Sequence, residues 1–447
     1  MAAQLSTLAG RVQPQKLLRE GRVARMVGMK LEAEGCDGAI GDRCRVLSED
    51  TVVEGEVVGF ADGRLVIMPE GDVTGLRLGA RVQPLGETAG VDVDEQLFGR
   101  VIDGAGRFLD GMPAPSCAQR VALRARSLNP LDRRPIAQPL DVGVRAINGL
   151  LTMGKGQRIG LFAGAGVGKS TLLGMMTRHT AADVIVVALV GERGREVREF
   201  VESILGPAGL ARAIVVATPA DYPPLMRIHG AWRATAIAEH FRNQGRDVLL
   251  LMDSLTRFAQ AQREIGLAVG EPPVSKGYPP SVFTLLPNLV ERAGNGREGS
   301  ITAVYTVLVE GDDHADPIAD AARAILDGHI VLSRRIADAG VFPAVDFESS
   351  VSRSMNSVTS ESHQHLVRDL KELYSVYQQN RDLVTIGAYS RGSDPKVDQA
   401  IDAFDSIQAY IRQPQQQQVT LDESSEHLSQ LGRLAKLTDV HANAPQP

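Results

Sequence analysis

The chain has 447 residues, with 48 basic and 54 acidic side chains and a formal net charge of −6. Its length allows two or three domains, and the near balance of charge argues against a protein that grips nucleic acid through its overall charge. The three cysteines lack metal-site spacing, and no apolar run approaches the ~20 residues of a membrane span, so we expect a soluble, cytoplasmic protein.

The first part of the chain contains two different patterns. Residues 1–24 carry leucines at roughly helical spacing, interrupted by Pro14. This pattern fits a frayed terminal helix and a segment that docks onto a partner helix equally well. Residues 25–95 carry short alternating runs, such as 52–60 and 64–68, separated by Gly, Asp and Glu turns. Short strands at such spacing predict a small β-barrel with a structural role.

Residues 96–356 alternate between apolar runs and helical patterns. The apolar runs lie at 184–190, 213–217, 248–253 and 301–308 and are nearly continuous. Strands that are buried on both faces have this composition. The sequence therefore predicts an α/β domain with a mostly parallel sheet and helices on both sides.

A glycine-rich segment lies between a short apolar run and a helical pattern in this domain. It comprises Gly164, Ala165, Gly166, Val167, Gly168, Lys169, Ser170 and Thr171. Glycines allow backbone N–H groups to turn toward phosphate oxygens, a lysine here reaches the β- and γ-phosphates, and the next hydroxyl ligates Mg²⁺. Ala163 stands where the P-loop pattern begins with glycine, which is a small departure. We expect a P-loop that binds ATP and Mg²⁺.

Several charged residues are candidates for the remaining chemistry. Asp253 ends an apolar strand, as does the acid that P-loop enzymes place beside Mg²⁺ through a water. Glu192 follows the strand at 184–190 and is either a group that polarises water or part of a solvated charge run, and spacing does not decide between them. Arg257 and Arg353 are both candidates to stabilise transition-state charge, and the sequence physics does not choose one.

Residues 357–447 are predicted to form a helical domain with a flexible tail. Leu366, Leu370, Leu373 and Tyr377 recur on one helix face. A glutamine-rich break at 413–418 is followed by another amphipathic segment.

The motifs together resemble the rotary ATPase family, which has a RecA-like P-loop NTPase core. The P-loop, residues 191–193, residues 252–259 and residues 352–353 carry this resemblance. Segments at 271–283, 310–313, 316–320 and 325–329 are similar to the protein-export branch, and those at 380–384, 387–389 and 392–395 lean to flagellar over virulence type III export ATPases. His314 and Ala315 depart from the export pattern.

The resemblance implies a role for each matching site residue. Lys169 and Ser170 would bind phosphates and Mg²⁺, and Asp253 would support a metal-bound water. Glu192 would be the base that polarises water. The resemblance therefore strongly favours a catalytic role for Glu192 over a place in a solvated charge run. Arg193 and Arg257 would be active-site arginines near the γ-phosphate, Arg353 an arginine finger offered across a subunit interface, and Phe342 the ring against adenine.

The resemblance also implies a homohexameric ATPase that energises flagellar type III protein export, including release of substrates and chaperones at the export gate. Expected partners are further copies of the chain, a stator-like regulator that binds residues 1–24, a central-stalk-like component, the export-gate membrane protein, and export chaperones and substrates, but no nucleic acid. It would act in the cytoplasm, peripherally at the inner membrane at the flagellar base. The alternatives are a virulence secretion ATPase, an ATP synthase catalytic subunit, a Rho-like RNA translocase, for which the barrel has Phe60 as its one aromatic and many acids, and a nucleotide-binding scaffold without turnover.

Overall fold

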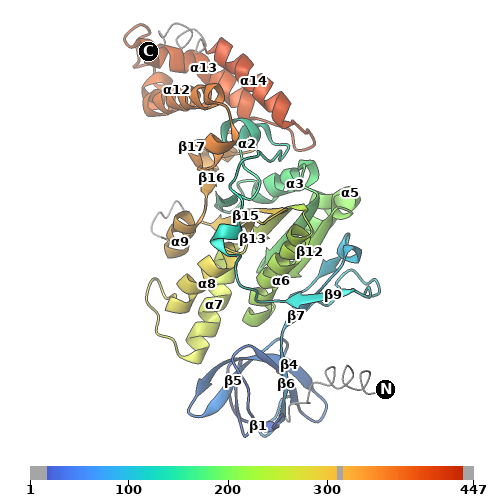
Figure 1. Ribbon diagram of the computed structural model, residues 1–447. Helices are drawn as coiled ribbons and strands as arrows, with labels where there is room; N and C mark the ends of the chain where they lie inside the picture. Colours follow the sequence, from blue (N-terminus) through green and yellow to red (C-terminus); the bar gives the residue numbers. More distant parts are fainter. Residues whose placement is uncertain (1–17, 310–315, 436–447) are drawn as a thin grey trace, which may run out of the picture. The chain divides into compact units, whose positions relative to one another are not determined.

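The computed structural model describes residues 18–309 and 316–435 and divides into two compact units (Figure 1). The first unit contains the described residues up to Gly90 together with 264–271, and the second contains the rest. His314, Ala315, most of the 1–24 segment and the end of the chain lie outside the described residues. No helix in the described part is both long enough and apolar enough to span a bilayer.

The first unit is a closed antiparallel barrel. Its strands are β1 (Gly21–Val27), β2 (Lys30–Glu34), β3 (Asp42–Leu47), β4 (Val52–Ala61), β5 (Arg64–Pro69) and β6 (Arg81–Thr88), in the order β1-β2-β5-β4-β3-β6. Alternate residues such as Leu31, Val46, Ile67 and Val82 fill the interior. Because the side chains of a strand alternate between its faces, the short alternating runs seen in the sequence close around this apolar core. The predicted barrel is confirmed.

The second unit is built on a nine-stranded, mostly parallel sheet. Its strands are β8 (Val101–Ile102), β10 (Arg158–Ala163), β11 (Val184–Val190), β12 (Ala213–Thr218), β13 (Asp247–Asp253), β14 (Gly294–Asn295), β15 (Ser300–Leu308), β16 (Gly328–Leu332) and β17 (Val345–Ser352). The order is β17-β16-β10-β15-β13-β11-β12-β8, with β14 paired to β15. Only β17 and β14 run antiparallel to their neighbours. A separate two-stranded sheet pairs β7 (Gly90–Val93) with β9 (Gln119–Ala122). The predicted α/β P-loop core is confirmed.

Helices cover both faces of the sheet. The helices before residue 361 are α2 (Arg145–Leu150), α3 (Lys169–His179), α4 (Gly194–Glu199), continued by a π-helical stretch (Phe200–Leu205), α5 (Gly206–Leu210), α6 (Pro224–Asn243), α7 (Leu255–Val269), α8 (Pro280–Val290), α9 (Pro317–Ile325), α10 (Arg334–Asp338) and α11 (Met355–Val358), with 3₁₀ turns at Glu95–Leu97 and Pro130–Asp132. Not all of them lie on the sheet. Every residue of β11 is buried, and Ile185 and Val187 pack in one cluster with α3. Helix α6 packs on β11, β12 and β13 outside that cluster, so it covers the opposite face. Two-sided burial explains why these strands are continuously apolar.

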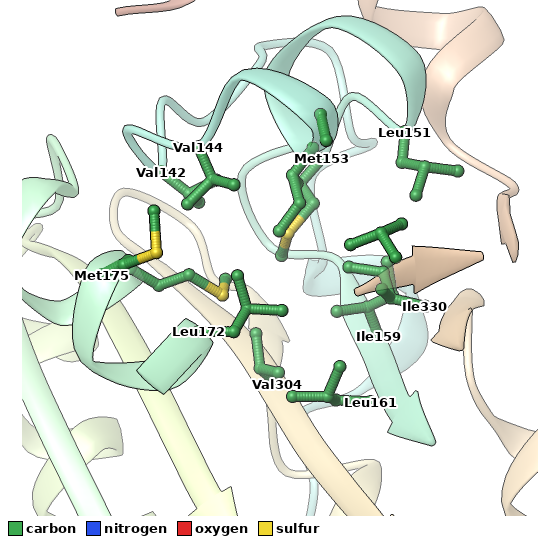
Figure 2. Packing of buried hydrophobic residues seen from close by; sticks show 14 of the residues in the cluster. Val142, Val144, Leu151, Met153, Ile159, Leu161, Leu172, Met175, Val304 and Ile330 are labelled. Atoms are coloured by element: carbon green, nitrogen blue, oxygen red, sulfur yellow. The ribbon is translucent and has the colours of Figure 1, made fainter. Parts of the chain in front are cut away.

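The chain ends in three helices that share the ATPase core. They are α12 (Glu361–Thr385), α13 (Pro395–Ile411) and α14 (Leu421–Leu434). Leu370, Ile407 and Leu428 belong to the same buried cluster as the sheet and α3. Figure 2 shows part of that cluster, with side chains from the segment around α2, from α3 and from the strands: Val142, Val144, Met153, Leu172, Met175, Ile159 and Ile330. Arg145 of α2 also donates to the carbonyls of Ala409, Tyr410 and Arg412 at the end of α13. The helices therefore form one compact unit with the core.

Candidate active site

The glycine-rich loop connects the end of β10 to the start of α3. Strand β10 ends at Ala163 and α3 begins at Lys169. Gly166 and Gly168 have φ angles of 76° and 88°, and residues that carry a Cβ rarely adopt such positive φ angles. Gly168 is also the residue that precedes the first turn of α3. The loop thus turns back on itself directly before a helix N-terminus, where backbone N–H groups and the helix dipole favour an anion.

The side chain of Lys169 lies between two carboxylates. Its Nζ is 2.7 Å from Oδ1 of Asp253 and 3.3 Å from Oε1 of Glu192. Asp253 is the last residue of β13, and Glu192 follows the end of β11 by two residues. Because neighbouring parallel strands end at the same edge of a sheet, residues far apart in sequence meet at the loop. The structure brings together three of the predicted site residues in one cluster.

The cluster holds one cationic side chain and two acidic ones, and this imbalance changes their protonation. Burial, with the nearby charge of Asp253, raises the pKa of Glu192 to about 7, even though Lys169 acts in the opposite direction. A hydrogen bond with Glu196 raises the pKa of Glu192 further. Burial lowers the pKa of Lys169, but the two carboxylates outweigh it, so that its pKa is raised overall. At neutral pH Lys169 is therefore a cation, and Glu192 lies near its titration midpoint, which suits a group that exchanges a proton with water.

A residue that the sequence analysis did not identify holds Asp253. The Thr306 hydroxyl donates to Oδ1 of Asp253 at 2.6 Å. Thr306 lies on β15, where the pairing of Met252 with Tyr305 brings it level with Asp253. In the sequence, Thr306 is recognisable only as a hydroxyl residue within a mostly apolar strand. Its partner could not be predicted, because it depends on which strand lies beside β15.

Arg257 lies against the segment that carries Glu192. A Cβ added at Gly191 would meet the Cβ of Arg257 at 2.8 Å, so only glycine permits this approach. The guanidinium donates to Gln260 through Nη1 at 2.9 Å. Its Nε is buried, and nothing in the described part of the chain accepts a hydrogen bond from it. Because a buried donor without a partner is costly, a phosphate oxygen would suit this position. The orphaned donor and the glycine cradle fit a nucleotide phosphate.

Phe342 also lies at the loop. A Cβ added at Gly168 would contact the Phe342 ring at 3.4 Å, and the ring is 41% exposed. The carbonyl of Phe342 accepts a hydrogen bond from the Gln413 N–H at 2.9 Å, which ties this segment to the residues after α13. A second contact was not foreseen: Arg334 of α10 donates to the Ala165 carbonyl at 2.8 Å. The position of Phe342 is compatible with stacking on a base, and its role stays a prediction.

Two predicted arginines do not join the cluster. The Arg193 side chain is 84% exposed and lies 3.8 Å from Glu196. Arg353 follows β17, which runs antiparallel to β16, so that Ser352 is level with Gly328. The loop instead follows the opposite end of these strands, where Ala163 is level with Leu332. Gly328 and Leu332 are four residues apart, which at the rise of a strand is about 13 Å, beyond the reach of an arginine side chain. Arg353 therefore does not serve the loop of its own chain.

The residues present fit a Mg²⁺ ion that is completed by substrate phosphates. Ser170 is the second residue of α3, beside the loop, and Asp253 is buried at the end of β13. Among residues 18–309 and 316–435, no group of three or more His, Cys, Asp or Glu side chains is arranged to hold a metal by itself. Mg²⁺ in phosphate-transfer sites is typically bound by one or two protein oxygens together with phosphates and waters, so this donor set is the expected one.

Two protein-family models match this chain. Residues 143–352 match the ATP synthase alpha/beta family, nucleotide-binding domain, and residues 359–430 match the T3SS EscN ATPase C-terminal domain. The chain is 55% identical to the flagellum-specific ATP synthase of Pseudomonas aeruginosa over 430 residues, which cover 95% of this chain and 94% of that protein. It is 57% identical to the flagellum-specific ATP synthase of Salmonella typhimurium over 408 residues, covering 88% and 90%.

The fold of this chain is similar to that of a chain in a solved assembly. The assembled ATPase EscN of the enteropathogenic E. coli type III secretion system superimposes with a TM-score of 0.88 at 43% identity, covering 92% of this chain and 99% of that chain. EscN in complex with its central stalk EscO gives a TM-score of 0.85 with the same coverage.

Proposed function

The chain belongs to the family of flagellum-specific ATP synthases and type III secretion ATPases, within the ATP synthase alpha/beta family, and we propose that it hydrolyses ATP to energise the export of flagellar proteins. The observation that carries the proposal is the cluster of Lys169 with Asp253 and Glu192 at the P-loop. It combines a phosphate-binding cation, a carboxylate beside the metal position and a carboxylate that titrates near neutral pH. Turnover requires these groups, whereas a binding scaffold would not need them, and this supports the proposal.

The residues of one chain perform most of the chemistry in this proposal. The loop N–H groups and Lys169 hold the phosphates. Arg257 would donate to an oxygen of the terminal phosphate through its Nε, which is buried and has no acceptor in the described part of the chain. Mg²⁺, when bound, neutralises charge on the β- and γ-phosphates, and Ser170 and Asp253 would hold it, the latter through a water. Glu192 orients the attacking water and takes its proton as the water oxygen bonds to the γ-phosphorus. The bond between that phosphorus and the bridging oxygen breaks, and ADP leaves.

A neighbouring subunit completes the site. Arg353 is exposed and lies at the end of its sheet away from its own loop. An arginine in this position can stabilise the transition state only in another copy of the chain, where such a finger is worth ~10³–10⁵ in rate. We infer a homohexamer with one site at each interface. The solved assembly of EscN supports this arrangement.

The choice of flagellar over virulence export rests on sequence similarity. The two flagellar relatives above are 55% and 57% identical to this chain, whereas EscN is 43% identical. Proposed partners are a central-stalk-like component, by analogy with the EscN–EscO complex, a stator-like regulator, the export gate, and chaperones with their substrates. The proposed location is the cytoplasm, peripherally at the inner membrane at the flagellar base.

The proposal is tested in two steps. Purified protein should hydrolyse ATP only with Mg²⁺, and Lys169→Ala should abolish turnover because the phosphate clamp is lost; normal hydrolysis by this variant would refute the site. In its own host, deletion of the gene should stop secretion of flagellar subunits, and the wild-type gene, but not Lys169→Ala, should restore it. Loss of virulence secretion with normal flagella would instead favour the alternative.

A further inference from the structure

Thr306 is a buried hydroxyl in a strand whose neighbouring residues are apolar. Thr306 itself is fully buried, as are Tyr305 and Val307 on either side of it. A hydroxyl in such a place is destabilising unless it has a hydrogen-bond partner. The partner of Thr306 is the carboxylate of Asp253, so the residue is tied to the site and not only to the core.

The hydroxyl has two acceptors within reach, and the distances show which one it uses. Its Oγ1 is 2.6 Å from Oδ1 of Asp253 and 3.4 Å from the carbonyl oxygen of Met252. A hydroxyl has one proton, and the short contact is typical of a charge-assisted bond to a carboxylate. The proton therefore lies on the line to Asp253.

Thr306 and Lys169 converge on the same oxygen of Asp253. Nζ of Lys169 is 2.7 Å from Oδ1, so this oxygen accepts two strong hydrogen bonds. Across the described residues, no donor is found for the other oxygen, Oδ2. Two donors from different directions fix the rotation of the carboxylate, and they leave Oδ2 free to accept from a metal-bound water.

We propose that Thr306 is a positioning residue for Asp253, and that its hydroxyl fixes the carboxylate so that Oδ2 is presented to Mg²⁺ and its waters. Lys169 alone does not secure this orientation, because the same ammonium must also contact phosphate. The inference rests on the proposed role of Asp253 in supporting Mg²⁺. Partners that orient a metal-supporting carboxylate typically contribute 10–100-fold to metal affinity or activity.

The test compares the Mg²⁺ dependence of nucleotide binding in variants at position 306. Thr306→Val keeps the shape and removes the hydroxyl, so ADP affinity in the presence of Mg²⁺ should fall by about 10–100-fold. ADP affinity in EDTA should be unchanged, because the loop and Lys169 are intact. In turnover, the Mg²⁺ concentration for half-maximal rate should rise. Thr306→Ser, which keeps the hydroxyl, should restore wild-type behaviour.

Thr302 on the same strand provides the matched control. Its hydroxyl is also buried, but it accepts from the Gly156 N–H at 2.9 Å, away from the loop. Thr302→Val should lower stability without changing the Mg²⁺ dependence. If Thr306→Val does not fold, Thr306→Ala removes the same hydroxyl without adding bulk, and the same comparison applies.

The outcomes separate this inference from the proposed function. Wild-type protein without Mg²⁺-dependent hydrolysis would refute the proposed function itself. An active wild type with a Thr306→Val variant of unchanged Mg²⁺ dependence would refute only the role of Thr306. Equal impairment of Thr306→Ser and Thr306→Val would show that packing, not the hydroxyl, is responsible, and would also overturn the inference.

Discussion

The two ends of the central sheet both gather charged side chains, but the balance of charge differs between them. At the loop end, one lysine faces two acids, Asp253 and Glu192, and the pKa of Glu192 is raised to about 7 by burial and by Asp253. At the other end, Arg158 pairs with Asp327 at 2.9 Å and also with Glu291, which lies 3.6 Å from Arg133.

The second group has two cations and two carboxylates and is balanced within the chain. The charges of such a network neutralise one another, so it needs no ligand. The loop end has unmatched acid and an orphaned arginine donor, so it is suited to bind both a cation and an anion. We therefore expect the unbalanced charge cluster to mark the reacting end of the sheet. The predictions below test this distinction.

Arg353 is the exception at the balanced end, and its variant should have the largest effect. Its guanidinium contacts only the Arg323 carbonyl, at 3.4 Å, within the described residues. Arg353→Ala should lower kcat by about 10³–10⁵ in the assembled protein, because each site loses its partner's cation. Steady-state hydrolysis at a protein concentration that supports assembly would measure this.

A mixing experiment separates a finger from a structural arginine. Neither Arg353→Ala nor Lys169→Ala should be active alone, but co-assembled chains should regain part of the wild-type rate. An intact loop in one chain then meets an intact arginine in the next. Failure of the mixture to recover any activity, despite normal assembly, would contradict the shared site.

Glu192→Gln should have the next largest effect. The amide keeps the size of the side chain but cannot accept the proton of the attacking water, so kcat should fall by about 10²–10⁴ while ATP still binds. Nucleotide binding and single-turnover hydrolysis would be measured together. Glu199→Gln, an exposed residue at the end of α4, is the matched control and should behave as wild type. Full turnover by Glu192→Gln would reduce Glu192 to a charge that supports Lys169.

The pH dependence of kcat/KM should reveal the same carboxylate. Glu192 works as a base when ionised, and its raised pKa means that it is protonated below about pH 7. The rate should therefore rise as pH increases through about 7 and level off above it. Lys169, Asp253 and Glu196 face this group, and the pKa of Lys169 is raised, so the lysine stays charged across this window. Glu192→Gln should lose that limb of the profile, while titration of the nucleotide's own phosphate remains. A profile with the same limb in both proteins would exclude Glu192 as its source.

The smallest effect on activity is expected at the balanced end. Asp327→Asn removes the charge that faces Arg158 and should lower the free energy of unfolding by about 1–3 kcal/mol. Its kcat/KM per folded molecule should not change. Urea denaturation and hydrolysis assays would measure the two quantities. Asp320→Asn, in an exposed pair with Arg323, is the control and should change stability by less than ~1 kcal/mol. Loss of turnover without loss of stability in Asp327→Asn would break the distinction between the two ends.

The parts of the site that are local in sequence could be predicted from the residues alone. The P-loop can be recognised in the sequence because its glycines, Lys169 and Ser170 are consecutive or nearly so at the turn from strand to helix. Asp253 is recognisable because an apolar strand ends on it. Glu192 was undecided from spacing alone, and resemblance to a family was needed to favour catalysis. The barrel and the parallel sheet could be predicted because each strand has its own pattern of apolar residues, alternating in the barrel and continuous in the sheet.

Strand order and register decided the rest. Thr306 meets Asp253 only because β15 lies beside β13, and Arg334 and Phe342 reach the loop only because the segment after β16 folds back over it. The sequence offered Arg257 and Arg353 as equal candidates, and the antiparallel pairing of β17 separated them by placing Arg353 beyond the reach of its own loop. Local sequence patterns thus determined which strands, helices and candidate side chains are present, because backbone conformation depends mainly on residues that are close together in the sequence. Pairing between distant strands decided which groups meet, because it depends on the packing of the whole core.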